Sequence, residues 1–332
     1  MKKTSPLRRS HFALHFRAAV FSTALVTSLL VTPRAAHATR LSPASSGVIV
    51  AVIDTGADIY HQNLKGHLWR NLGELGYDSL HRDKSSNGID DDGNGFIDDV
   101  NGWNFSDNDK NLHDEQGHGT HIAGIISGAP PAQVMVLKAF DAHRSGQEVL
   151  TATINAIHYA IRMHAQIINY SGGGSQPSPE EEAALGIAAK AGILVVAAAG
   201  NDRSDADRFG FYPAAYHLPN ILSVAAVDQA GSLLPSSNYG VKTVKLAAPG
   251  QQILSTLPQN QYGMMTGTSQ ATASVTKTAV LLYAQEQKTD VLRSPSSMID
   301  RMVSTADRVP ELVGKLHNPV VLNTLRALRS SL

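Results

Sequence analysis

Short apolar segments rich in β-branched residues recur along this chain, with room for a helix between most of them. Glycine or polar residues bound each segment, as is typical of strands buried on both faces of a parallel sheet. The segments cover residues 46–53, 134–139, 167–170, 193–198 and 221–227. A chain with this pattern is constrained to a fold in which both faces of the sheet are covered.

Helical patterns lie between these segments and supply that cover. Residues 151–164 repeat isoleucine at three- and four-residue spacing, and the alanine-rich residues 180–191 end at Gly192. A further helix is predicted from Thr268 or Ser269 to about Gln285; it is apolar almost all round and is therefore expected to be buried. Strands that alternate with helices form βαβ units. We therefore predict an α/β three-layer sandwich with a mainly parallel sheet.

Composition narrows the class of protein. The 332 residues are 42% hydrophobic and 17% charged, as in an ordinary globular protein. The formal net charge of +0 gives no support to a nucleic-acid partner. The chain has no cysteine, which excludes disulfides, thiol nucleophiles and cysteine-based zinc sites. Without internal repeats or long linkers, residues 39–332 are predicted to form one monomeric domain.

The N-terminus has the three parts of a secretory signal. Basic residues precede the apolar stretch from Ala18 to Val31, and Ala36-His37-Ala38 supplies a small-x-small cleavage site. We expect residues 1–38 to be a signal peptide for export to a periplasm or the medium, with no membrane span after cleavage; an uncleaved anchor is the alternative. The mature chain is expected to begin near Thr39, with no room for a pro-domain before the first strand.

Three polar motifs lie at the ends of predicted elements. Asp54 follows the first strand, His118 precedes an apolar helix start, and Ser269 opens the buried helix. Functional side chains of α/β sheets gather at the carboxyl ends of the strands. A hydroxyl nucleophile needs a base to take its proton and a carboxylate to orient that base. We therefore predict a catalytic triad of Asp54, His118 and Ser269.

Two further segments fit the same chemistry. Ser171, Gly172 and Gly173 follow a predicted strand, and an extended peptide can pair with such a backbone as an added strand. Asn201 follows the apolar segment of residues 193–198, and its side-chain amide is a suitable donor to the oxyanion of a tetrahedral intermediate. These residues are predicted to bind the substrate strand and the oxyanion.

Taken together, the motifs resemble those of the subtilisin-like serine protease family. The matching strings are Val-Ile-Asp54-Thr-Gly, His118-Gly-Thr-His-Ile-Ala-Gly, Val-Val-Ala-Ala-Ala-Gly-Asn201, Ala247-Ala-Pro-Gly and Gly-Thr-Ser269, which together cover roughly residues 47–285. The resemblance implies a roughly seven-stranded sheet, the triad and oxyanion donor above, and hydrolysis of polypeptides through an acyl-enzyme on Ser269. At Gly172 many members carry a larger residue, so the resemblance leaves the size preference of the pocket open. A catalytically silent peptide-binding member is the alternative.

An acidic loop stands apart from these motifs. Asp90, Asp92 and Asn94, followed by Gly95, reproduce the first half of a calcium-binding loop, and Asp98 adds a nearby carboxylate. Without a cation these carboxylates repel one another, and similar loops occur in subtilisin-like proteases. We predict a structural calcium held by Asp90, Asp92, Asn94 and Asp98, with a solvated acidic turn as the alternative.

Overall fold

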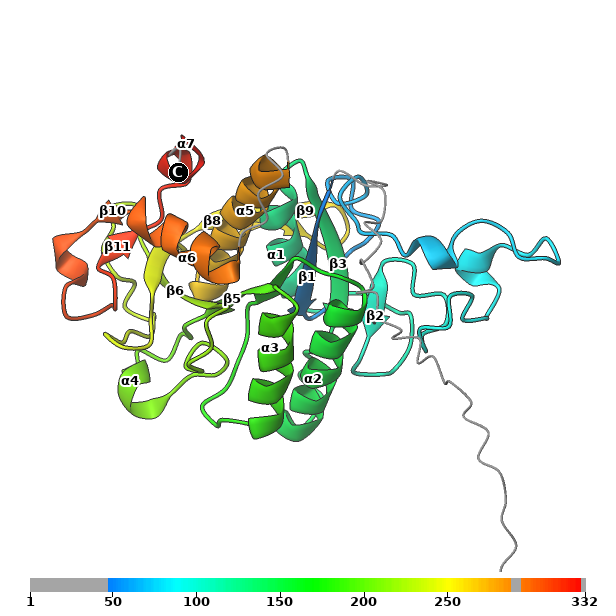
Figure 1. Ribbon diagram of the computed structural model, residues 1–332, viewed down its shortest axis with the longest axis horizontal. Helices are drawn as coiled ribbons and strands as arrows, with labels where there is room; N and C mark the ends of the chain where they lie inside the picture. The colour runs from blue at the N-terminus through cyan, green and yellow to red at the C-terminus, as the bar shows by residue number, and fades with distance from the viewer. Residues whose placement is uncertain (1–46, 288–293, 330–332) are drawn as a thin grey trace, which may run out of the picture. The chain divides into compact units, whose positions relative to one another are not determined.

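The fold is built on one large sheet. In the computed structural model, which describes residues 47–287 and 294–329, nine strands of the described chain form this sheet in the order β10-β11-β7-β6-β5-β4-β1-β3-β2 (Figure 1). The strands are β1 Val48–Asp54, β2 Gly102–Asn104, β3 Ala132–Lys138, β4 Ile167–Tyr170, β5 Leu194–Ala198, β6 Ile221–Val227, β7 Leu246–Pro249, β10 Asp307–Arg308 and β11 Val320–Val321. From β7 to β2 all neighbours are parallel, which confirms the predicted mainly parallel, roughly seven-stranded sheet.

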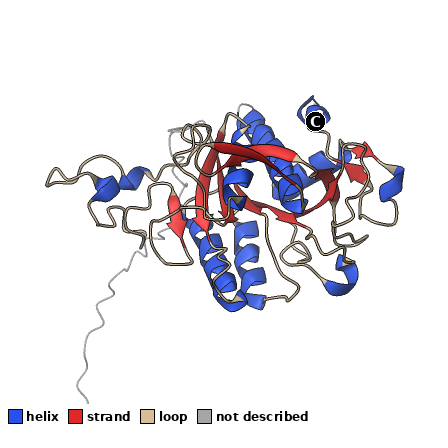
Figure 2. Cartoon of the chain, turned by 180° about the vertical axis from the view of Figure 1, so that it is seen from behind, coloured by secondary structure: helices blue, strands red, loops and turns tan. Residues whose placement is uncertain are grey.

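Helices cover both faces of the sheet, as Figures 1 and 2 show. They are α1 His118–Ser127, α2 Gly146–Arg162, α3 Pro179–Lys190, α4 Ala206–Phe209, α5 Thr268–Gln287, α6 Pro295–Ser304 and α7 Thr324–Arg329. Successive side chains of a strand point to opposite faces: Val50 and Val52 of β1 pack into the core with α1, α5 and α6, while Ala51 and Ile53 pack into the core with α2 and α3. The three-layer prediction is thereby confirmed.

Helix α2 begins earlier than the isoleucine pattern predicts. Its N-cap is Ser145, whose hydroxyl accepts a hydrogen bond from the backbone N–H of Glu148, while the Glu148 carboxylate accepts one from the backbone N–H of Ser145. This capping box satisfies two otherwise unpaired amides. The helix therefore starts at Gly146 rather than at Thr151.

Several elements were not predicted. The short strands β2 and β7 complete the parallel sheet, and β10 and β11 extend it beyond β7. A separate antiparallel hairpin joins β8 (Ile253–Leu257) to β9 (Gln261–Met265) and packs against α1.

The predicted signal peptide, residues 1–38, lies outside the described residues. Among the residues that are described, no helix combines the length and apolar character needed to span a bilayer.

Candidate active site

The predicted site residues gather along one edge of the sheet. Asp54 is the last residue of β1, Ser171 directly follows β4, and Asn201 lies shortly after β5. These three strands are neighbours in the order β5-β4-β1 and run parallel, so their carboxyl ends meet at the same edge. Helices α1 and α5 begin over this edge with His118 and Thr268. The topology thus builds the crevice that an α/β sheet uses for its functional residues.

Asp54 and His118 form an acid–base pair in which Asp54 is buried and His118 is partly exposed. The Nδ1–H of His118 donates to Oδ1 of Asp54 over 2.7 Å, and the same oxygen accepts the backbone N–H of Thr55. Asp54 is 1% exposed, and its Oδ2 has no hydrogen-bond partner among the described residues. Attraction to Asp54 raises the pKa of His118 against the opposing effect of burial. Because Nδ1 is bonded to Asp54, Nε2 is the ring nitrogen available to a substrate or nucleophile.

The turn that carries His118 is held by Asp114, a buried carboxylate that was not predicted. Its Oδ1 accepts the Thr55 hydroxyl and the backbone N–H of Gly117, and its Oδ2 accepts both the hydroxyl and the backbone N–H of Thr120. The Thr55 hydroxyl in turn accepts the N–H of Gly119. Asp114 therefore ties the end of β1 to the first turn of α1. The signal in the sequence was an aspartate three residues before Gly117, where it can accept turn amides.

Ser269 is the second residue of α5 and is 7% exposed. Its hydroxyl donates to the carbonyl oxygen of Ser171 over 3.0 Å. Peptide N–H groups in the first turn of a helix have no intrahelical acceptor, and the helix dipole places partial positive charge there. Negative charge that develops next to Ser269 is therefore stabilised by α5.

Asn201 is oriented by the residue before Ser269. Its Oδ1 accepts the backbone N–H of Thr268 over 2.9 Å and the Thr268 hydroxyl over 3.2 Å, which turns Nδ2 away from these donors. The buried Asn238 fixes the loop itself: its Nδ2 donates to the carbonyl of Ala199, and its Oδ1 accepts the N–H groups of Asp202 and Ser204. Asn238 is a positioning residue that no local sequence pattern indicated.

The glycine segment after β4 borders an open cavity. Gly173 has φ +151°, and a Cβ there would lie 2.2 Å from the carbonyl oxygen of Tyr212, so this position requires glycine. A cavity of about 580 Å³ lies beside Gly172, with Phe140, Leu150 and Tyr212 among its apolar walls. Ser171, Gly172 and Gly173 thus lie between Ser269 and a hollow large enough for a side chain.

Comparison with known proteins identifies the family. Residues 45–323 match the subtilase family of peptidases. The chain belongs to the subtilase family. It is 35% identical to the major intracellular serine protease of Bacillus subtilis (strain 168), an alignment that covers 72% of this chain and 69% of that protein. It is 34% identical to thermitase of Thermoactinomyces vulgaris, over 80% of this chain and 82% of thermitase. The prediction of a subtilisin-like serine protease family is confirmed.

A further relative and two solved structures are also similar to this chain. This subtilase is 34% identical to the thermophilic serine proteinase of Bacillus sp. (strain AK1), over 82% of its own chain and 60% of that relative. Among solved structures, a cold-adapted subtilisin-like serine proteinase superposes with a TM-score of 0.64 at 27% identity, over 82% of this chain and 89% of that one. A lanthipeptide protease, at 21% identity and a TM-score of 0.68, shares the fold.

The acidic loop of this subtilase is arranged differently from its predicted calcium site. Oδ2 of Asp98 accepts the ammonium of Lys110 over 2.6 Å, and Asp90 accepts backbone amides from within its own turn. Asn94 donates its side-chain amide to the carboxylates of Asp92 and Asp99. Of the four predicted ligands, Asp92 alone belongs to the carboxylate group that the described structure gathers.

That group consists of Glu74, Asp92 and Asp99, which each bring one carboxylate oxygen within 4.8 Å of the others. Glu74 is fully buried; its Oε1 accepts the N–H groups of Asp91 and Asp92, whereas its Oε2 is buried with no partner in the described chain. Burial raises the pKa of Glu74 and that of Asp99. Sequence reasoning missed Glu74 because it lies outside the loop pattern.

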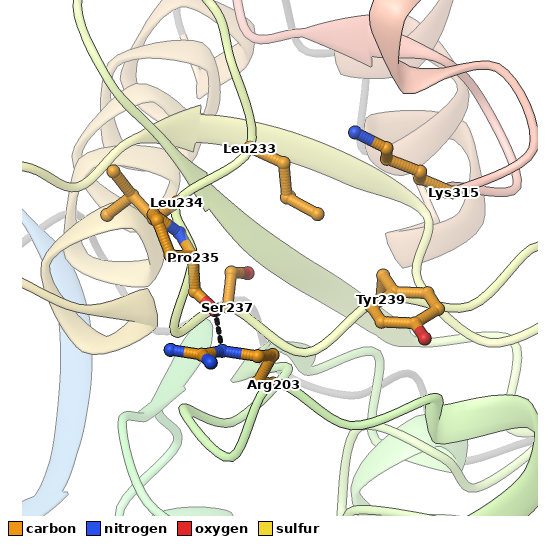
Figure 3. A pocket seen from close by; sticks show the side chains of 7 residues that line it. All are labelled: Arg203, Leu233, Leu234, Pro235, Ser237, Tyr239 and Lys315. Carbon is orange, nitrogen blue, oxygen red and sulfur yellow. Dashed lines mark hydrogen bonds between the residues drawn. The ribbon is translucent and has the colours of Figure 1, made fainter.

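A second hollow, of about 640 Å³, is lined by seven residues that Figure 3 shows. Arg203, Leu234 and Tyr239 are among its lining residues, and the Nε–H of Arg203 donates to the carbonyl of Pro235. It holds none of the predicted site residues, so its size alone gives it no role in the chemistry.

Proposed function

We propose that this subtilase is a serine endopeptidase in which Ser269 is the nucleophile, His118 the general base, Asp54 the group that orients His118, and Asn201 an oxyanion donor. The observation that supports it most is the convergence of these residues at one sheet edge, with the 2.7 Å Asp54–His118 hydrogen bond at its centre. Ser171, Gly172 and Gly173 would pair with an extended polypeptide substrate.

In the proposed reaction the Ser269 hydroxyl gives up its hydrogen bond to the Ser171 carbonyl and donates to Nε2 of His118 instead. Oγ attacks the scissile carbonyl carbon while Nε2 takes its proton, and the imidazolium is stabilised by Asp54. The oxyanion accepts hydrogen bonds from Nδ2 of Asn201 and the backbone N–H of Ser269. His118 then returns the proton to the leaving amine as the C–N bond breaks, and water hydrolyses the ester by the same steps in reverse.

A covalent probe separates this proposal from a silent peptide-binding member. A fluorophosphonate should label the wild-type chain at Ser269, whereas Ser269→Ala and His118→Ala should remain unlabelled. Thr272→Ala on the same helix is a matched control that keeps the labelling. A folded wild-type protein that is neither labelled nor able to hydrolyse a denatured protein substrate would instead favour the silent member.

We also propose that the acidic loop binds a structural calcium ion through Glu74, Asp92 and Asp99. The all-oxygen donor set suits calcium, and the unpartnered, buried Oε2 of Glu74 is satisfied by a cation. This set differs from the predicted ligands Asp90, Asn94 and Asp98, which lie outside the gathered carboxylate group. Asp92 is common to both sets.

Finally, we propose that residues 1–38 are removed during export and that residues 39–332 act as a monomeric peptidase domain. Support comes from the basic, apolar and small-x-small order of the N-terminal residues. Mass spectrometry of the protein recovered outside the cytoplasm tests this: an N-terminus near Thr39 supports cleavage, and an intact Met1 in the membrane fraction supports the anchor.

A further inference from the structure

Two segments directly follow the paired strands β4 and β5, namely Ser171–Gly174 and Ala199–Asn201. We call the space between these two segments the slot. Ser269 lies at its mouth, because its hydroxyl reaches the carbonyl of Ser171 and its neighbour Thr268 holds Asn201. A residue whose carbonyl is attacked by Ser269 and polarised by Asn201 must therefore lie against this slot.

Each wall of the slot contains a glycine, and an aromatic ring from another segment lies beside both glycines. Gly173 belongs to one wall and Gly200 to the other; neither has a Cβ, and both have positive φ. A Cβ on Gly173 would lie 2.7 Å from the ring of Phe211, and a Cβ on Gly200 would lie 2.8 Å from the same ring. Carbon atoms in contact are about 3.5–4.0 Å apart. The Phe211 ring therefore occupies the space that both glycines leave.

The chain around Phe211 is fixed to the substrate-binding segment. Tyr212 and Gly174 exchange two backbone hydrogen bonds, of 2.7 Å and 3.0 Å, and the Phe211 carbonyl accepts the N–H of Ala215. The ring of Tyr212 packs against that of Tyr216 at a centroid distance of 4.7 Å. Phe211 is thus attached to the wall of the slot rather than to an independent loop.

Provided that the proposed peptidase activity holds, we propose that Phe211 determines specificity by restricting the residue that supplies the cleaved carbonyl to glycine, alanine or serine. A longer side chain at this position meets the Phe211 ring. The cavity of about 580 Å³ beside Gly172 remains open to a large side chain elsewhere in the substrate. The substrate class is therefore a polypeptide with a small residue immediately before the cleaved bond.

Cleavage profiling with internally quenched peptides tests the proposal. The peptides differ only in the residue before the cleaved bond, which is alanine, leucine or phenylalanine. Wild type should prefer alanine over phenylalanine by about 100-fold in kcat/KM, and Phe211→Ala should reduce this preference at least about 10-fold. Phe209→Ala is the matched control, because Phe209 lies two residues away and is 58% exposed; it should keep the wild-type profile.

Labelling of Ser269 by the fluorophosphonate keeps the two proposals distinguishable. Wild type that is labelled but cleaves equally well after phenylalanine overturns the role of Phe211 and leaves the peptidase in place. A Phe211→Ala variant that is labelled but keeps the wild-type preference also overturns the role of Phe211 and leaves the peptidase in place. If Phe211→Ala does not fold, Phe211→Leu should shift the preference in the same direction by a smaller factor, and an unchanged profile overturns the proposal. Wild type that is neither labelled nor active removes the peptidase function and this inference with it.

Discussion

The two sides of the candidate active site, which we call the cleft, differ in the groups that line them. On the side of β1 and α1, buried side-chain oxygens hold the acid–base pair: Asp54 accepts from His118, and Asp114 holds the turn before it. On the side of β4, β5 and α5, backbone carbonyls and glycines dominate, with Ser269 bonded to the carbonyl of Ser171. The difference separates the two tasks, since fixed carboxylates orient a proton carrier while bare backbone leaves room for a peptide.

The largest effect on activity is expected from removing the proposed nucleophile, which lies on the backbone-lined side. Ser269→Ala should lower kcat by about 10⁶-fold, as in subtilisin, because no acyl-enzyme can form. The fold should persist, since the lost hydrogen bond to Ser171 contributes about 1 kcal/mol. Peptide hydrolysis and circular dichroism on one sample measure both quantities; hydrolysis at the wild-type rate would remove Ser269 from its role.

A smaller but still large effect is expected on the charged side. Asp54→Asn should lower kcat by about 10⁴-fold, because the carboxylate no longer fixes the His118 tautomer or stabilises the imidazolium. Neutral His118 accepts the proton, so activity falls as the pH drops through its pKa. Because Asp54 raises that pKa, the acid limb of kcat/KM should lie above pH 6.5 in wild type and move to lower pH in the variant.

The pH–rate profile of Asp54→Asn is best compared with that of Asp107→Asn. Asp107 is an exposed carboxylate that accepts hydrogen bonds from Arg144 and Asn104 and makes none to His118. It should keep both the wild-type rate and the wild-type acid limb. An acid limb that stays in place in Asp54→Asn would show that another group titrates.

Asn201→Ala should have a moderate effect on the backbone-lined side. We expect kcat to fall about 10²- to 10³-fold with a smaller change in KM, because the oxyanion exists only in the transition state. Steady-state kinetics with Asn155→Ala, an exposed change on α2, as the control measures the split. A raised KM with unchanged kcat would make Asn201 an ordinary binding residue.

The smallest effect is expected outside the cleft, at the acidic loop. If calcium binds only the folded chain, removing it with a chelator should lower the melting temperature by roughly 5 °C. Asp92→Asn should abolish this sensitivity, whereas Asp98→Asn should keep it because Asp98 is paired with Lys110. Identical melting curves with and without chelator in wild type would favour the solvated turn.

The sequence allowed the central elements to be predicted because their signals are local. β4 and β6 have the predicted bounds, and α5 begins at one of the two predicted residues. The motifs around Asp54, His118 and Ser269 lie at element ends, where strand and helix patterns stop. The strand β2 has only three residues, which is too few for a recognisable pattern. One of them is Gly102, which is required because a Cβ there would lie 1.9 Å from the carbonyl oxygen of Val136.

The residues that were missed act across long stretches of chain. Glu74 approaches Asp92 only because the turn at Leu72–Glu74 folds onto the acidic loop. Phe211 lies in a segment without strand or helix periodicity and reaches Gly173 and Gly200 through space. Single-sequence patterns describe neighbours along the chain, so contacts of this kind require the fold.

The strands β10 and β11 should affect where one copy of this peptidase can cleave another copy. β11 pairs with β7 and β10 pairs with β11, so part of the C-terminal region is hydrogen-bonded into the sheet. A peptidase cleft binds extended chain whose backbone N–H and C=O groups are unpaired. The backbone groups of paired strands are already hydrogen-bonded to a neighbouring strand. Self-digestion should therefore spare the paired residues 307–308 and 320–321, and it should begin in the largely irregular stretch between β1 and β2, where the acidic loop lies.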